Sequence, residues 1–192
     1  NLLDWLAFEF MAKGWSVKEL HRLIMTSETY RRASTHPDID QLAKLDSGGN
    51  SYAVFRPRRL AAEELRDAML AVTGELNQKP GGIPARPDMN LEAALQPRMI
   101  MGTFAPSYVP DTKPAQRNRR SVYALKLRGQ RDPFMTTFNQ PGPDKSCELR
   151  DSSNVTPQVF TLFNSEESAD RALAFAARVL KETKGDNQAV RR

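Results

Sequence analysis

The chain has 192 residues, a net charge of +5 and an apolar fraction of 40%. This composition is typical of a folded globular protein, and it excludes a disordered or membrane-embedded chain. Arginine outnumbers lysine by 19 to 9, which favours planar contacts to carboxylates, phosphates or sugar edges. The single cysteine, Cys147, excludes an internal disulfide.

Apolar spacing predicts a helical hairpin over residues 2–30. The first helix should end at Gly14, and Ser16 should cap the second. Because the turn is very short, the two helices should pack antiparallel. The amphipathic pattern starts at residue 2 without an initiator methionine, so we expect a fragment of a larger protein whose upstream part carries any export signal.

A third helix is predicted over residues 58–76. Its expected buried stripe is Ala61, Leu65, Ala68, Met69, Val72 and Leu76. Its expected solvent side is Glu63, Glu64, Arg66 and Asp67. The span 77–118 holds seven of the 13 prolines, so we expect a long irregular segment across the surface, of a length that is usually functional or flexible.

Alternating side chains predict a strand over 121–127, which could pair with a short strand over 99–104 as an antiparallel ribbon. Asp132 before Pro133, and Thr156 before Pro157, are typical helix starts. Phe134, Phe138, Phe160 and Phe163 are expected in the core. A last helix is predicted over 165–184. Its expected buried side is Ala169, Ala172, Leu173, Ala176, Ala177 and Leu180.

These elements predict a mainly α fold: a helical hairpin with further packed helices, a small two-stranded β ribbon and a long Pro-rich surface segment. The hairpin and the helices over 58–76 and 165–184 should form the core. We expect one domain over residues 1–184, with the irregular segment 77–118 inside it and a flexible tail over 185–192.

A cluster of basic residues without acids occupies the span 117–131. Its members are Arg117, Arg119, Arg120, Lys126, Arg128 and Arg131. On a strand, residues two apart share a face, so these side chains could form a ridge for an anion or a sugar. The alternative is a solvated strand whose arginines pair with Asp132, Glu148 and Asp151.

The loop over 144–156 is a second concentration of polar residues. Asp144, Glu148 and Asp151 could supply oxygen ligands to a hard cation, but their spacing matches no calcium loop, and neighbouring basic residues argue against a metal. Cys147 could be a nucleophile, although no histidine lies near it in sequence. A partly buried structural thiol is the alternative.

Several reaction motifs are absent from the sequence. It has no Cys-x-x-Cys-His haem attachment, no phosphate-binding or dinucleotide-binding loop, no His-Glu-x-x-His zinc motif and no Gly-x-Ser-x-Gly elbow. Whether the chain is an enzyme therefore stays open, and the residues predict no cofactor or metal in it.

Ordered sequence blocks carry a family resemblance. They are LLDWLAFEF, GWSVKELHRLIMTSETYRRAS, FRPRRLAAEELRDAML, RRSVYALKLRGQRDPF, SCELRDSSNVTPQ and LFN, which together extend from about residue 2 to 184. The chain resembles the DUF1553 family, a C-terminal domain of unknown function that is common in planctomycete cytochrome-type proteins. The resemblance implies an exported, periplasmic, multidomain protein, in which haem c would belong to an absent upstream domain.

Three functions are compatible with these observations. The first is a non-catalytic scaffold or ligand-binding module that contacts upstream domains of the same polypeptide, a polysaccharide or a polyanion. Its candidate polar cluster is Arg119, Arg120, Arg128, Arg131, Asp132, Cys147, Glu148, Arg150 and Asp151. The second is a carbohydrate-active or other hydrolytic enzyme that uses carboxylates such as Asp132, Glu148 and Asp151. The third, nucleic-acid binding through the Arg-rich ribbon, is disfavoured because acids occur throughout the helices.

Overall fold

The structure is a computed structural model, and it describes residues 1–55, 57–96, 98–100, 102–105 and 107–184. The predicted tail over 185–192 lies outside the described residues. The chain divides into two compact units, Asn1–Arg58 and Arg59–Arg192. Each unit is described here by itself, so the expectation of one domain over residues 1–184 stays a prediction.

The first unit contains the predicted helical hairpin, built from α1 (Leu2–Ala12) and α2 (Val17–Thr26), followed by α3 (Ile39–Leu45). Gly14 and Trp15 both adopt left-handed backbone conformations, with φ of 68° and 61°, which reverse the chain within a few residues. The Ser16 hydroxyl then accepts a hydrogen bond from the Glu19 backbone N–H at 3.3 Å and caps α2.

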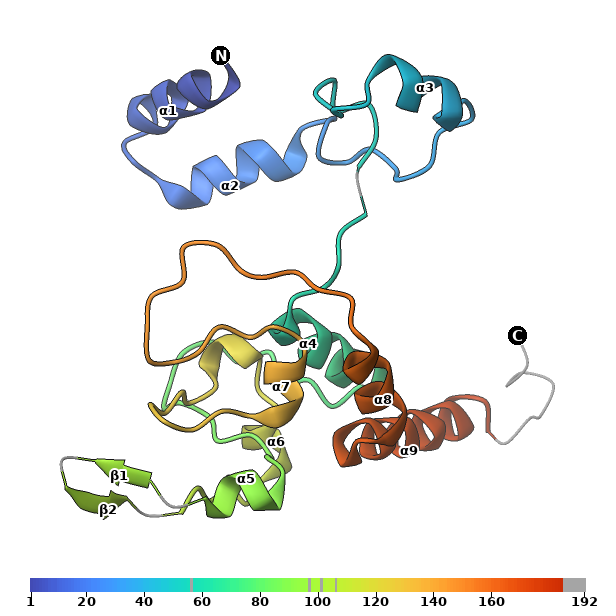
Figure 1. The fold of residues 1–192 in the computed structure, drawn as a ribbon. Coiled ribbons are helices and arrows are strands. Elements are labelled where there is room, and N and C mark those ends of the chain that lie inside the picture. The colour runs from blue at the N-terminus through green and yellow to red at the C-terminus, as the bar shows by residue number, and fades with distance from the viewer. Residues whose placement is uncertain (56, 97, 101, 106, 185–192) are drawn as a thin grey trace. The chain divides into compact units, whose positions relative to one another are not determined.

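The second unit is built around α4 (Ala62–Thr73), which contacts both α7 (Pro133–Thr137) and α9 (Glu166–Glu182) (Figure 1). Between α7 and α9 lies α8 (Thr156–Asn164), which packs against both of them. The mainly α class predicted from the sequence is confirmed. The prolines at residues 133 and 157 each lie in the first turn of their helix, as predicted.

The hydrophobic core of this unit lies between α4 and α7. It consists of Ala62, Phe134, Met135 and Phe138, with Leu65 and Met69 packed against it. The rings of Phe134 and Phe138 are 5.0 Å apart. The prediction that these two phenylalanines are buried is confirmed. The same prediction for Phe160 and Phe163 is wrong, because their side chains on α8 are 63% and 82% exposed.

The apolar face of α9 is also not where the alanine pattern predicted it. Leu173 is 70% exposed and Leu180 is 54% exposed, whereas Arg171 and Arg178 face α4. Arg171 forms an ion pair with Glu75, and Arg178 donates to the Val72 carbonyl at 2.7 Å. Two arginines therefore anchor α9 to the C-terminal end of α4, where free carbonyl groups and the helix dipole favour cations.

The segment over residues 77–118 is partly regular. It contains α5 (Leu91–Leu95), α6 (Pro114–Arg117) and an antiparallel hairpin of β1 (Arg98–Ile100) with β2 (Thr103–Ala105). It does not lie wholly on the surface, because Ala85, Ala93, Ala94 and Tyr108 are buried. The predicted short strand over 99–104 therefore falls within this hairpin.

The predicted strand over 121–127 is wrong. Ser121–Tyr123 forms a turn of 3₁₀ helix, and the following residues are extended. Ala85 donates to the Tyr123 carbonyl and accepts from the Leu125 N–H, which makes an isolated parallel bridge. The two-stranded ribbon is therefore only loosely as predicted, since β1 pairs with β2 and not with residues 121–127.

Replacing Phe134 by Ala should lower the free energy of unfolding by about 3–5 kcal/mol, because it opens a cavity in the core. The matched control is Phe163→Ala, which removes the same group from an exposed position and should cost under about 1 kcal/mol. Urea denaturation followed by circular dichroism measures both values. Equal losses in the two variants would contradict the placement of the core.

Candidate functional site

Three charged residues on one side of α4 organise the polar part of the second unit. Arg66 and Asp67 lie three and four positions after Glu63, so both are its neighbours on one side of the helix. The sequence predicted that they face solvent, and this prediction is wrong. Their side chains are only 18%, 17% and 22% exposed, because loops from later in the chain cover them. We call them the polar face of α4.

Arg66 is the central member of this face. Its guanidinium donates to the backbone carbonyls of Arg117 at 2.9 Å and Arg119 at 3.0 Å, and to the Ser121 hydroxyl at 3.1 Å. Burial lowers the pKa of Arg66 from its ordinary value, and the charge of Asp67 acts against that shift. The retained charge strengthens the bonds to three groups of the segment 117–121.

Asp67 fixes the same segment from the next position. Its carboxylate accepts from the Ser121 backbone N–H at 2.8 Å and from the Ser121 hydroxyl at 2.7 Å. Because Ser121 is only 2% exposed, its N–H and hydroxyl groups are shielded from water and need partners within the protein. Arg66 and Asp67 together therefore hold the start of the 3₁₀ turn against α4.

Arg119 belongs to the scaffold in this structure. It is 3% exposed and donates to the backbone carbonyls of Lys79, Gly81 and Ile83. Its guanidinium also lies 4.5 Å from the centre of the Tyr123 ring. These contacts tie the segment 79–83 to residues 119–123, and they leave little of Arg119 for a ligand.

The other basic residues of the predicted ridge are not gathered by a strand. Arg120 is half-exposed and lies 3.9 Å from the Asp67 carboxylate. Arg128 and Arg131 are exposed, and Lys126 lies 3.4 Å from the carboxylate of Glu63. Since residues 121–127 form a turn and an extended segment, the alternation that would align a ridge is absent.

The loop over 144–156 is attached to the same helix face through Arg150. The Arg150 guanidinium contacts both carboxylate oxygens of Glu63, at 2.6 and 3.3 Å. Burial acts to raise the pKa of Glu63, but the hydrogen bonds from Arg150 and the nearby basic charges outweigh burial and lower it. Glu63 thus joins Lys126 and Arg150, which come from two distant parts of the sequence.

The remaining candidates of this loop are exposed. Glu148 and Asp151 are open to solvent, and Asp144 accepts from the Gly129 backbone N–H at 3.0 Å. The expectation of a partly buried thiol is wrong, because Cys147 is exposed, and its Sγ donates to the nearby Leu149 carbonyl at 3.2 Å. Among the described residues, no group of three or more His, Cys, Asp and Glu side chains is placed to hold a metal ion.

A cleft of about 520 Å³ opens beside the polar face of α4. Residues from α4, α7, the start of α9 and the segment 88–91 line it, and Met69, Leu70 and Phe134 form an apolar part of its wall. Its acidic lining residues are Asp88, Asp132, Glu166, Glu167 and Asp170. Its basic lining residues are Arg66, Arg117 and Arg171. A cleft of this volume is within the range of small-molecule sites.

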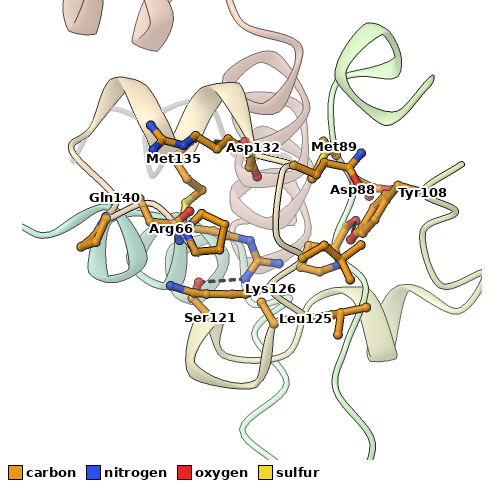
Figure 2. Close-up of a pocket in the computed structure, with 17 residues that line it drawn as sticks. Arg66, Asp88, Met89, Tyr108, Ser121, Leu125, Lys126, Asp132, Met135 and Gln140 are labelled. Atoms are coloured by element: carbon orange, nitrogen blue, oxygen red, sulfur yellow. Dashed lines mark hydrogen bonds between the residues drawn. The ribbon is translucent and has the colours of Figure 1, made fainter. Parts of the chain in front are cut away.

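A smaller inner cavity of about 60 Å³ shares Arg66, Asp88, Met89 and Asp132 with this cleft. Figure 2 shows the Arg66 guanidinium among the side chains of this cavity, with its hydrogen bond to Ser121 drawn. Tyr108 is buried here and donates to the Pro87 carbonyl at 2.8 Å. Burial, reinforced by nearby carboxylates, raises the pKa of Tyr108, so the phenol stays protonated.

Asp132 is the sequence candidate that the structure places in both cavities. Its carboxylate accepts from the Met135 N–H at 3.3 Å and caps α7, as predicted. Burial raises the pKa of Asp132, and the charge of Glu167 raises it further, although the backbone bonds and Arg66 act in the opposite direction. A carboxyl group with a perturbed pKa inside a cleft is a candidate for function.

Most residues of the cleft could not be identified from the sequence. Asp88, Tyr108, Glu167 and Asp170 were not singled out, and Arg66 was assigned to solvent. One signal was available for Arg66, because Glu63, Arg66 and Leu70 follow helical spacing and mix charge with a buried apolar residue. Nothing in the sequence indicated that Asp88 would line the same cleft as the start of α9.

The fold and the site together define a mainly α protein with a polar cleft. The chain belongs to the PSD1 family, described as a protein of unknown function (DUF1553), whose model matches residues 1–192. No curated protein and no solved structure matches the chain. None of the helices formed by the described residues has the length and apolar character needed to cross a lipid bilayer.

The two carboxylates of the site should give opposite pH dependences of stability. The folded state raises the pKa of Asp132, so its stabilising contribution is present at low pH and is lost as pH rises above about 4. The folded state lowers the pKa of Glu63, so its contribution is present above about 4 and is lost as pH falls.

Urea denaturation from acid to neutral pH tests this with Asp132→Asn and Glu63→Gln. Asparagine still caps a helix, so Asp132→Asn should gain stability relative to the parent as pH rises. Glu63→Gln should lose stability relative to the parent over the same range. Parallel curves for the parent and both variants would contradict the electrostatics described above.

Proposed function

We propose that this chain is a ligand-binding module and that the 520 Å³ cleft receives a small polar ligand or the end of a longer one. The observation that carries the proposal is the combination of an apolar wall with converging charged groups in one cavity. Concave sites that place polar groups beside an apolar wall are typical of ligand binding, and this cleft is at the polar end of that range.

The construction of the cleft supports this proposal. Arg66 is held by three hydrogen bonds, and Asp132 is held by its capping bond. Arg171 is held by its ion pair with Glu75. Side chains fixed in this way lose little conformational entropy when a ligand binds, which favours affinity.

A polyanion is disfavoured as the ligand of this cleft, because five acidic residues line it against three basic ones. The exposed Arg128 and Arg131 do not line this cleft, although Arg131 lines the smaller cavity beside it. A polysaccharide remains compatible with the cleft, since hydroxyl groups can both donate to carboxylates and accept from guanidiniums.

The resemblance described above supports the wider context of the proposal. In that context the module belongs to an exported, periplasmic, cytochrome-linked protein of the planctomycete type and contacts upstream domains of the same polypeptide. Haem c would be held by an upstream domain, since the sequence of this chain has no Cys-x-x-Cys-His motif.

Carboxylate-dependent hydrolysis is the second candidate function. It is favoured by one observation, the raised pKa of Asp132 beside Glu167 in the same cleft. A carboxyl group with a raised pKa beside a second carboxyl group is the kind of pair that acid and base catalysis of glycoside hydrolysis uses. The other two carboxylates named from the sequence, Glu148 and Asp151, line neither cavity and are exposed.

Nuclear magnetic resonance screening of ¹⁵N-labelled protein against neutral, cationic and anionic polar fragments tests the binding function. Bound fragments should shift the amide resonances of Met89, Asn90 and Asp170, which line the cleft. The variant Leu91→Trp places a large ring at the exposed lining of the cleft and should weaken this binding at least about tenfold by steric exclusion.

The matched control is Leu95→Trp, on the same short helix but outside the lining, which should bind as the parent does. Fragments that shift only resonances elsewhere, or equal binding by both variants, would contradict the proposed function. Cleavage of a glycosidic fragment by the parent and not by Asp132→Asn would favour the hydrolytic candidate.

A further inference from the structure

The basic residues of the cleft already have partners within the protein. Arg66 is engaged with the segment 117–121, and Arg171 is paired with Glu75. Arg117 lies 3.0 Å from the Asp88 carboxylate and donates to two backbone carbonyls. The guanidiniums of Arg66 and Arg171 are therefore occupied with holding the fold, whereas the buried Nε of Arg117 lies near the Asp88 carboxylate without forming a hydrogen bond to a described residue.

Three acidic residues of the cleft are in the opposite condition. Glu166, Glu167 and Asp170 line it from the start of α9, and none of the three forms a side-chain hydrogen bond or an ion pair with a described residue. Glu166 and Glu167 lie in the first turn of α9, where the helix dipole stabilises acids and accounts for their presence without a ligand, whereas Asp170 lies beyond that turn. These acids alone therefore do not indicate a ligand, and a second observation, in the adjoining cavity, is needed.

That second observation is a buried amide oxygen in the inner cavity. Gln130 lines this cavity and is 8% exposed. Its Nε2 donates to the Ala93 carbonyl at 3.0 Å, but its Oε1 has no hydrogen-bond donor among the described residues. Buried polar atoms are normally paired, so this acceptor calls for a donor from a ligand or from water.

Both cavities contain hydrogen-bond acceptors that lack a donor. Unpaired carboxylates face the outer cleft, an unpaired amide oxygen lines the inner cavity, and Asp132 is common to both. An ammonium group offers three N–H donors, a positive charge and no acceptor. A neutral hydroxyl supplies one donor but no positive charge, and a carboxylate anion supplies neither a donor nor a positive charge.

We propose that the ligand of this cleft presents a protonated amine, which the carboxylates of Glu167 and Asp170 bind while a further donor of the ligand reaches Gln130 Oε1. This inference rests on the proposed binding function and specifies its ligand class. The cation would also counter the effect of Glu167, whose charge contributes to the raised pKa of Asp132.

Three probes with the same five-carbon chain test the inference in ¹⁵N titrations at low salt. They are cadaverine, a dication; 1,5-pentanediol, which is neutral; and glutarate, a dianion. Cadaverine should shift the amides of Asp170 and Arg171 in a saturable manner, and the other two should bind at least about tenfold more weakly. Added salt should weaken cadaverine binding, because mobile ions screen the exposed carboxylates.

Charge-removing variants identify the groups responsible. Glu167→Gln and Asp170→Asn should each weaken cadaverine binding about threefold. The control is Glu182→Gln at the other end of α9, outside the lining, which should leave affinity unchanged. Gln130→Met keeps the chain length but removes the acceptor, together with the Nε2 donor to the Ala93 carbonyl. It should also weaken cadaverine binding while the rest of the spectrum shows an intact fold.

Different outcomes would reject the amine ligand and the proposed binding function. Equal binding of cadaverine and 1,5-pentanediol in the cleft would reject the amine but keep the binding function, and so would tighter binding of glutarate. Unchanged cadaverine affinity in Gln130→Met would reject the inner contact and leave that oxygen to water alone. Failure of every fragment to reach the cleft would reject the proposed function itself.

Discussion

The second unit of this protein depends on one buried cation. Arg66 enters the interior of a loop-rich region and satisfies two backbone carbonyls and one hydroxyl that come from more than fifty residues later in the chain. Charge-assisted bonds of this kind contribute more than neutral ones, and a buried carbonyl without a donor is costly. The path of the segment 117–121, and the wall of the cleft that it supports, both follow from this contact.

The helix that carries Arg66 packs in two different ways. Its apolar side meets Phe134, Met135 and Phe138, which sets the position of α7. Its polar face meets Ser121, Lys126 and Arg150, which sets the position of the loops. The cleft lies where these two kinds of packing adjoin, and this explains why it combines an apolar wall with charged groups. Asp132, at the start of α7, is part of both the packing and the site.

Local signals in the sequence predicted several turns and helix starts, whereas the short helices α3, α5 and α6 were not predicted. The Gly14 turn, the Ser16 cap, the Asp132–Pro133 start and the extent of α9 all depend on a few adjacent residues, which single-sequence patterns can capture. The buried face of α4 was predicted only in part, since Leu65 and Met69 pack against the core but Val72 is exposed. The buried face of α9 was not predicted, because this helix carries alanines and long charged side chains on more than one side. The stems of Arg171 and Arg178 pack while their charged ends find carboxylates or carbonyls, a behaviour that hydropathy does not register.

The site was predictable only in part. Asp132 was identified through its capping motif, whereas Asp88 and the acids of α9 line the same cleft through a tertiary arrangement that no spacing in the sequence encodes. The apparent strand over 121–127 was misleading for a related reason. Its apolar and polar side chains do alternate, but Ser121 is hydrogen-bonded to Asp67 and Arg66. The chain therefore turns at that point before it extends.

Amide hydrogen exchange in Arg66→Met tests the central role of this residue most directly. The substitution keeps an unbranched side chain but removes every donor. The account predicts that the amides of Ser121 and Tyr123 lose protection by at least about tenfold, while the amides in the middle of α8 and α9 keep theirs. Unchanged protection at Ser121 and Tyr123, in a variant that remains folded, would contradict the claim that Arg66 holds this part of the chain in place.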